Sequence, residues 1–267
     1  MFRGVVVQHL GTPLSNGTAL NRGVAIVYDE TDAVARFFPR GAEDHPTPQE
    51  RQVITAPSRV SIPDAVTVVR CDSDVRAWFW ENVAARVCAP DGEIAPEERR
   101  RCLWEFGQRV AGGVAAAGLR AVSIRSCDVQ ITPPNAASTS FDYRSGRYVG
   151  LHVDDHDHLM PSKRRSAFQL LCLNVGRAER YLHFVNVAVP DMIAALRGKV
   201  NIAPRTPVRD IVAAFFTAFR DYPIVRVTLP PDYGYLAVTQ YVVHDGAPNA
   251  RGEADVAFLM AGTFALA

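Results

Sequence analysis

Short runs of β-forming residues dominate the second half of the chain, and this pattern limits the fold more than any other feature. Seven runs rich in Val, Leu, Phe and Tyr follow residue 119, separated by Pro, Gly, Asn and Asp; they span residues 121–132, 146–154, 166–175, 180–189, 224–229, 233–244 and 254–264. Runs of this length between turn residues are typical of strands. A sandwich or barrel of about seven strands is therefore expected in this part.

Three other segments have helical features. Residues 74–88 open on an Asp that can cap a helix, and their apolar side chains recur near helical spacing. Residues 96–119 begin with Pro and two Glu, as helix N-termini prefer, although a Gly pair weakens the middle. Residues 207–221 resemble an amphipathic helix inserted among the strands.

Helices followed by strands predict an α+β fold, mainly β. We expect a jelly-roll core with N-terminal supporting helices and one inserted helix. The whole chain, residues 1–267, is predicted to form one domain. Residues 1–120 would be its N-terminal helical or mixed part, and residues 121–267 the jelly-roll core that carries the functional site.

Charge and hydropathy exclude several classes of partner. Lys and Arg number 29 and Asp and Glu 28, so no charge excess favours nucleic acid or an anionic membrane. No run approaches the roughly 18 apolar residues of a spanning helix, and the N-terminus lacks the features of a secretory signal. Five scattered cysteines without a CxxC pair indicate free thiols in a reducing compartment. We therefore expect a cytoplasmic protein with neither nucleic acid nor membrane as partner; its oligomeric state stays open.

The stretch GLHVDDHDHLMP, residues 150–161, is the densest group of metal-binding side chains. His152 and Asp154 lie at the end of an expected strand, where side chains alternate, so both point to the same face. The polar residues that follow come after the strand pattern stops and are expected in a loop, at most supporting the metal or contacting substrate; they are Asp155, His156, Asp157 and His158.

A metal site of this kind needs a third ligand from elsewhere in the chain. His244 ends the long run 233–244 and precedes a turn, so it is expected at a strand end, as His152 is. His9 and His45 lie outside the strand-rich part, and His183 suits a buried core histidine equally well. Two His and one carboxylate leave open coordination positions for Fe(II) chemistry, but zinc accepts the same set.

Residues 122–264 resemble the Fe(II)/2-oxoglutarate-dependent oxygenases. The resemblance lies in GRYVGLHVDD with its HxD, in the strand FQLLCLNVG, and in PPDYGYLAVTQYVVHDGAPNARGEADVAFLMAGTF. It implies a double-stranded β-helix in which His152, Asp154 and His244 are both the catalytic centre and the metal ligands. It further implies Fe(II) as cofactor, 2-oxoglutarate as cosubstrate and a small-molecule substrate. Halogenating relatives replace the carboxylate by a small residue, so Asp154 favours hydroxylation, desaturation or ring formation.

The cosubstrate position is where the chain departs from that family. The family usually places an Arg on the final strand, and none occurs in ADVAFLMAGTF. Arg251, in the turn after His244, is the first candidate to bind the far carboxylate of 2-oxoglutarate, because a guanidinium donates two parallel hydrogen bonds. Arg165 and Arg180 are the substitutes.

Two further points stay open in the sequence. The side chains of Arg125, Tyr143, Arg144 and Arg147 suit either the mouth of a site for an anionic molecule or the exposed surface of hairpins. The alternative functions are an iron oxygenase or oxidase that does not use 2-oxoglutarate, and a zinc-binding or hydrolytic barrel protein.

Overall fold

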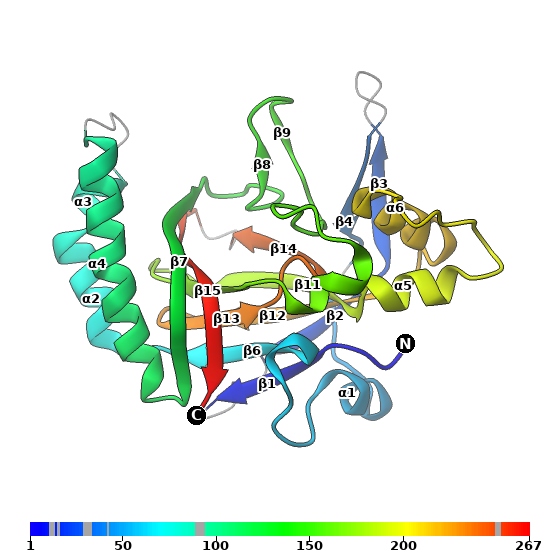
Figure 1. Ribbon diagram of the computed structural model, residues 1–267, viewed down its shortest axis with the longest axis horizontal. Helices are drawn as coiled ribbons and strands as arrows, with labels where there is room; N and C mark the ends of the chain where they lie inside the picture. The colour runs from blue at the N-terminus through cyan, green and yellow to red at the C-terminus, as the bar shows by residue number, and fades with distance from the viewer. Residues whose placement is uncertain (11–13, 15–16, 29–33, 42, 89–93, 249–251) are drawn as a thin grey trace.

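Two β-sheets packed face to face form the centre of the protein, with helices on both outer sides (Figure 1). The computed structural model describes residues 1–10, 14, 17–28, 34–41, 43–88, 94–248 and 252–267. The larger sheet has six strands, in the spatial order β1 (Val6–Leu10), β6 (Ala65–Arg70), β13 (Tyr233–Ala237), β10 (Gln169–Asn174), β15 (Asp255–Leu266) and β7 (Leu119–Thr132). The smaller sheet has five, in the order β14 (Val242–Pro248), β11 (Arg180–Ala188), β12 (Pro223–Leu229), β2 (Thr18–Arg22) and β5 (Glu43–Asp44).

The chain crosses repeatedly between the sheets. After β7 in the larger sheet, the segment at His152 bridges to β14 of the smaller one. The chain then returns to β10, forms the antiparallel pair β11 and β12, and continues through β13, β14 and β15, which alternate between sheets. This alternation defines a double-stranded β-helix, or jelly roll, so the predicted α+β, mainly β fold is confirmed.

The sheets also include strands from residues 1–120, the part predicted to be helical or mixed. Strands β1, β2, β5 and β6 all come from residues 1–120. Five of the six residues of β6 are buried, because β6 lies inside the larger sheet between β1 and β13. A strand covered on both faces lacks the alternation that marks a strand in sequence.

Helices α2 (Ser73–Asn82), α3 (Ala84–Val87) and α4 (Pro96–Ala115) cover the outer face of the larger sheet, near the positions predicted for them. Phe106 of α4 meets Phe258 of β15 edge to face, with ring centroids 4.6 Å apart. A short helix, α1 (Pro48–Ile54), lies beside β1. Thr47 and Glu50 form a capping box at its start.

Two helices, rather than the one predicted, stand between β11 and β12. They are α5 (Val189–Leu196) and α6 (Val208–Ala218), and they pack against the outer face of the smaller sheet. The apolar residues that lead into α5 resemble a continuation of the preceding strand, which is why the sequence concealed this helix. No helix among the described residues is long and apolar enough to cross a membrane.

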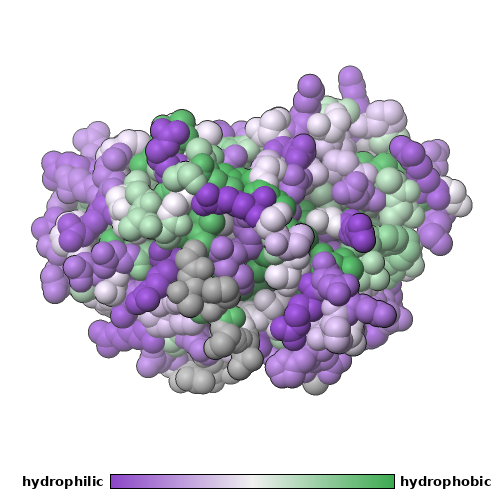
Figure 2. All heavy atoms as spheres, turned by 90° about the horizontal axis from the view of Figure 1, so that it is seen from below, coloured by the Kyte–Doolittle hydropathy of each residue, from purple (hydrophilic) through white to green (hydrophobic). Residues whose placement is uncertain are grey.

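The remaining elements are two hairpins, β3 (Val24–Tyr28) with β4 (Ala35–Pro39) and β8 (Phe141–Asp142) with β9 (Arg147–Tyr148), and two 3₁₀ helices, η1 (Ile62–Asp64) and η2 (Pro161–Ser166). The face seen from below in Figure 1 is mostly hydrophilic at its rim, with hydrophobic residues toward its middle (Figure 2). Scattered apolar surface of this kind is ordinary for a folded domain.

Candidate metal centre

His152 and His244 are direct neighbours across an antiparallel bridge. The His152 amide donates to the His244 carbonyl at 3.0 Å, and the His244 amide donates to the His152 carbonyl at 2.8 Å. Paired residues of a bridge carry their side chains on the same face. The two imidazole rings accordingly lie 4.8 Å apart, centroid to centroid.

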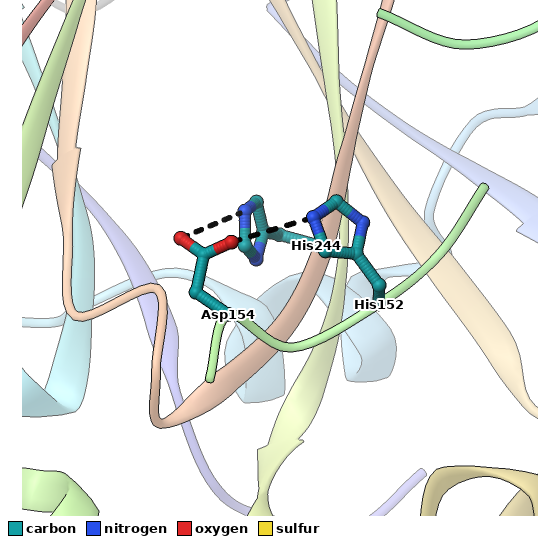
Figure 3. A group of neighbouring side chains, drawn as sticks. All are labelled: His152, Asp154 and His244. Carbon is teal, nitrogen blue, oxygen red and sulfur yellow. Dashed lines mark ion pairs between the residues drawn. The ribbon is translucent and has the colours of Figure 1, made fainter. Parts of the chain in front are cut away.

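Asp154 completes the group from two residues further along. Its amide donates to the Thr239 carbonyl at 3.2 Å, which holds this segment against the chain that leads into β14. Asp154 Oδ1 lies 3.5 Å from His152 Nε2, and Asp154 Oδ2 lies 4.0 Å from His244 Nε2. One candidate ligand atom from each residue lies within 4.8 Å of the others (Figure 3). The structure thus brings together the three residues that the sequence singled out.

Backbone carbonyls orient both rings toward a common point. His152 Nδ1 lies 2.7 Å from the Gly150 carbonyl, and His244 Nδ1 lies 3.2 Å from the Val242 carbonyl. A carbonyl only accepts, so Nδ1 carries the proton in each ring and Nε2 keeps its lone pair. This arrangement of the outer ring nitrogen is usual for metal-binding His, so the donor set fits a divalent metal ion.

The protonation states of Asp154 and His244 are consistent with this fit. Burial raises the pKa of Asp154, but the neighbouring His152 and His244 outweigh burial and hold it well below its usual value. Burial lowers the pKa of His244 to about 4. Burial also lowers the pKa of His152, yet Asp154 and Asp245 outweigh it, so the net shift is upward. At neutral pH Asp154 is therefore an anion and His244 is neutral, as metal ligands need to be.

Gly150 brings the His152 segment into place. Its φ is 75°, and a Cβ atom there would lie 2.4 Å from the Phe37 carbonyl oxygen. The next amide, of Leu151, donates to that same oxygen at 2.7 Å. The strand expected over 146–154 therefore stops at β9, and His152 pairs with β14 as an isolated bridge.

The rest of the polar run lies around the metal centre and is not part of the group of three. The His156 and His158 side chains are 65% and 85% exposed, and His156 Nε2 comes no closer than 3.8 Å to the Asp154 carboxylate. Asp157 pairs with Arg125 at 3.1 Å and accepts from Gln240 Nε2 at 2.9 Å. These positions agree with the expected loop.

Arg164 anchors that loop, although nothing in the sequence marks this residue as buried. It lies in η2 and its side chain is only 3% exposed. Its guanidinium donates to the Asp154 carbonyl at 3.0 Å, to the Gln240 carbonyl at 3.1 Å and to the Asp155 carboxylate. Arg164 therefore fixes the backbone of a candidate ligand without facing the metal.

A cavity of about 400 Å³ opens beside the three residues. Polar side chains of β7 and the following loop line one side of it, among them Arg125, Ser126, Asp128, Gln130 and Thr139. Neighbouring strands of the same sheet contribute Leu170, Cys172, Tyr235, Leu259 and Ala261, and β11 of the smaller sheet contributes Arg180. A few polar groups in a partly apolar cavity are typical of a small-molecule site.

The three arginines considered for the cosubstrate carboxylate lie in different places. Arg251 lies outside the described residues. The Arg165 side chain is 55% exposed and pairs with Asp64 at 2.6 Å, away from the cavity. Arg180 is 2% exposed and lines the cavity. Among the residues considered for the mouth of an anion-binding site, Arg125 lines the cavity. Tyr143 is 88% exposed on the β8–β9 hairpin.

No protein-family model matches the chain, and no curated protein matches it. Among solved structures it is similar to the nickel complex of ThoJ, a non-heme monooxygenase, with a TM-score of 0.42 and 11% identity over 74% of this chain and 71% of that one. It is also similar to the Kdo hydroxylase KdoO, described as a non-heme Fe(II) alphaketoglutarate dependent dioxygenase, in apo form and with alphaketoglutarate and Fe(III). Both KdoO comparisons give a TM-score of 0.45 and 12% identity over 74% of this chain and 79% of that one. Likeness at this level concerns the fold, so the side chains must carry any functional conclusion.

Proposed function

We propose that this protein is a non-haem Fe(II)/2-oxoglutarate-dependent oxygenase that oxidises a C–H bond of a small molecule. One observation carries the proposal: two His and one Asp converge beside a cavity that also contains a buried arginine. Two His and one carboxylate with open positions favour non-haem Fe(II). A buried cation in the same cavity favours an anionic cosubstrate.

His152, Asp154 and His244 would hold the metal through two Nε2 atoms and one carboxylate. The carbonyls of Gly150 and Val242 keep both rings in the required tautomer, so little reorganisation accompanies binding. Asp154 supplies one negative charge to a divalent ion. Three side-chain ligands would leave coordination positions of the metal open to the cosubstrate and O₂.

Arg180 is the residue that we assign to the far carboxylate of 2-oxoglutarate. Arg180 and Phe184 share one face of β11, and Phe184 stands opposite His244 in the sheet register. Four residues along a strand span about 13 Å. The Arg180 side chain spans part of the distance from its own backbone to His244. A five-carbon dicarboxylate such as 2-oxoglutarate would span the rest. Tyr235 lines the same part of the cavity.

Bound Fe(II) and 2-oxoglutarate would supply the oxidising chemistry, in which 2-oxoglutarate, O₂ and a C–H substrate become succinate, CO₂ and an oxidised product. The protein's share is to fix metal, cosubstrate and substrate relative to one another and to exclude bulk water. Ser126, Asp128 and Gln130 face the cavity from β7. These side chains favour a polar small molecule as substrate.

Metal content and succinate formation test this proposal together. Anaerobically purified protein should bind one Fe(II) and release succinate from 2-oxoglutarate in air. Arg180→Met should raise the 2-oxoglutarate requirement at least tenfold, since a charge-assisted hydrogen bond contributes about 1.5–3 kcal/mol. Arg165→Met is the matched control and should resemble wild type.

The alternatives give different results. Arg251→Met tests the first choice from the sequence, and a rise in the 2-oxoglutarate requirement in that variant alone would move the role to Arg251. Iron binding without succinate release would indicate an oxygenase or oxidase that does not use 2-oxoglutarate. Exclusive zinc binding would support a hydrolytic or zinc-binding protein and refute the proposal.

A further inference from the structure

Arg180 already has a carboxylate partner inside the protein. Its Nη2 lies 3.3 Å from Asp255 Oδ2, and the two side chains are only 2% and 4% exposed. Nη1 donates to the Cys172 thiol sulfur at 2.8 Å. Arg180 Nε and Asp255 Oδ2 have no hydrogen-bond partner among the described residues. The pair is thus held by charge, with hydrogen-bonding capacity left on both members.

The two members differ in their relation to the cavity. Arg180 begins β11 and lines the cavity, whereas Asp255 begins β15 and reaches Arg180 from the larger sheet. An unpaired buried guanidinium would cost several kcal/mol. Asp255 therefore compensates the charge of Arg180 when no anion occupies the cavity.

A second carboxylate at Arg180 creates a charge conflict. Asp255 sits on a strand and is almost fully buried, so it cannot turn to water when 2-oxoglutarate arrives. Two carboxylates would then share one guanidinium in a weakly polarisable interior. Keeping two carboxylates ionised in one site is costly. A proton on one of them removes the charge conflict.

We propose that Asp255 is the positioning residue of the cosubstrate subsite: it holds the guanidinium of Arg180 and takes up a proton when a carboxylate of 2-oxoglutarate joins that guanidinium. This inference rests on the proposed function, in which Arg180 binds 2-oxoglutarate. Bound cosubstrate and protonated Asp255 then leave one negative and one positive charge at the subsite. The protonated carboxyl group keeps its place beside Arg180.

Among the other titratable groups around Arg180, Asp245 is the one that can compete with Asp255 for this proton. Burial raises the pKa of the Cys172 thiol on β10 and of the Tyr235 phenol on β13, so both are already protonated at neutral pH. Asp245 on β14 is also buried, and burial raises its pKa to about 7. Its carboxylate accepts a hydrogen bond from Ser138 Oγ at 2.7 Å. Burial likewise raises the pKa of Asp255, against the opposing charge of Arg180.

Calorimetry of 2-oxoglutarate binding to the anaerobic Fe(II)-loaded protein tests the inference. Titrations at one pH in two buffers of different ionisation enthalpy give the number of protons taken up. We expect uptake approaching one proton in wild type at pH 7–8. Affinity for 2-oxoglutarate should accordingly fall by up to tenfold for each unit of rising pH in this range, because proton uptake and affinity are linked.

Asp255→Asn should remove the proton uptake and the pH dependence, and should bind 2-oxoglutarate more tightly than wild type at alkaline pH. Asp232→Asn is the control, since the Asp232 side chain is only 13% exposed and pairs with Arg76 but does not line the cavity. If Asp255→Asn does not fold, the two-buffer measurement on wild type still decides. Normal binding without proton uptake, or uptake that persists in Asp255→Asn, would overturn this inference alone. Absence of 2-oxoglutarate binding would contradict the proposed function and this inference with it.

Discussion

Replacing Arg164 by Met is the sharpest test of how the loop of the candidate metal centre is held. The guanidinium is buried and donates to three acceptors, two of which are backbone carbonyls. Met keeps the apolar stem and removes every donor. The carbonyls of Asp154 and Gln240 would then lose a charged partner in a place that water does not reach easily.

The magnitude follows from those contacts. Each hydrogen bond from a charged donor contributes about 1.5–3 kcal/mol. The Asp155 side chain is 39% exposed, so it regains water and adds little. The two carbonyls together then give a loss of about 3–5 kcal/mol, after the Met stem recovers some packing. In a domain of this size that corresponds to a Tm lower by about 10 °C.

The assay pairs thermal unfolding with metal titration, using Arg165→Met as control. Arg165 is adjacent in sequence, but its side chain and that of its partner Asp64 are 55% and 44% exposed, so its loss should cost less than about 1 kcal/mol. Arg164→Met should also weaken metal binding by about 10–100-fold, because Asp154 loses its backbone support. Equal Tm and equal metal affinity in the two variants would refute this reasoning.

Three further predictions concern the same region. Asp154→Ala should lose most metal binding and Asp155→Ala should retain it; equal metal loss in both would mean that the wrong carboxylate was chosen. Gly150→Ala should lower the Tm by more than Gly146→Ala does, because a Cβ at 150 meets the Phe37 carbonyl at 2.4 Å whereas one at 146 meets nothing within 4 Å; similar Tm values would contradict this. Burial lowers the pKa of His183 to about 4, so its contribution to stability is complete above about pH 6.5 and up to about 3 kcal/mol is lost as pH falls from there toward 4. Acid unfolding that is unchanged in His183→Gln would exclude this contribution.

Local pattern was enough to predict the jelly-roll core and to single out His152 and Asp154, whereas His244 was chosen as the third candidate from the family resemblance. The run of short strands fixes the fold class, and the alternation at residues 152 and 154 places two side chains on one face. Sequence alone did not show that His152 and His244 pair directly, because an isolated bridge between segments 92 residues apart leaves no local signal.

Packing between segments distant in sequence accounts for the features that the sequence patterns did not predict. Arg164 and Arg180 look like surface charges, yet both are buried because backbone carbonyls or Asp255 compensate them in the folded chain. Strand β6 was missed because it is buried on both faces, and α5 because its apolar start continues a strand pattern. Each of these depends on partners distant in sequence.

An anaerobic crystal structure with Fe(II) and 2-oxoglutarate tests the central claim most directly. We expect one metal ion bound by His152 Nε2, His244 Nε2 and an Asp154 carboxylate oxygen, each at about 2.0–2.2 Å. The far carboxylate of 2-oxoglutarate should lie on the Arg180 guanidinium. A metal ion bound away from these three side chains, or His244 turned from His152 when the metal is present, would contradict the account.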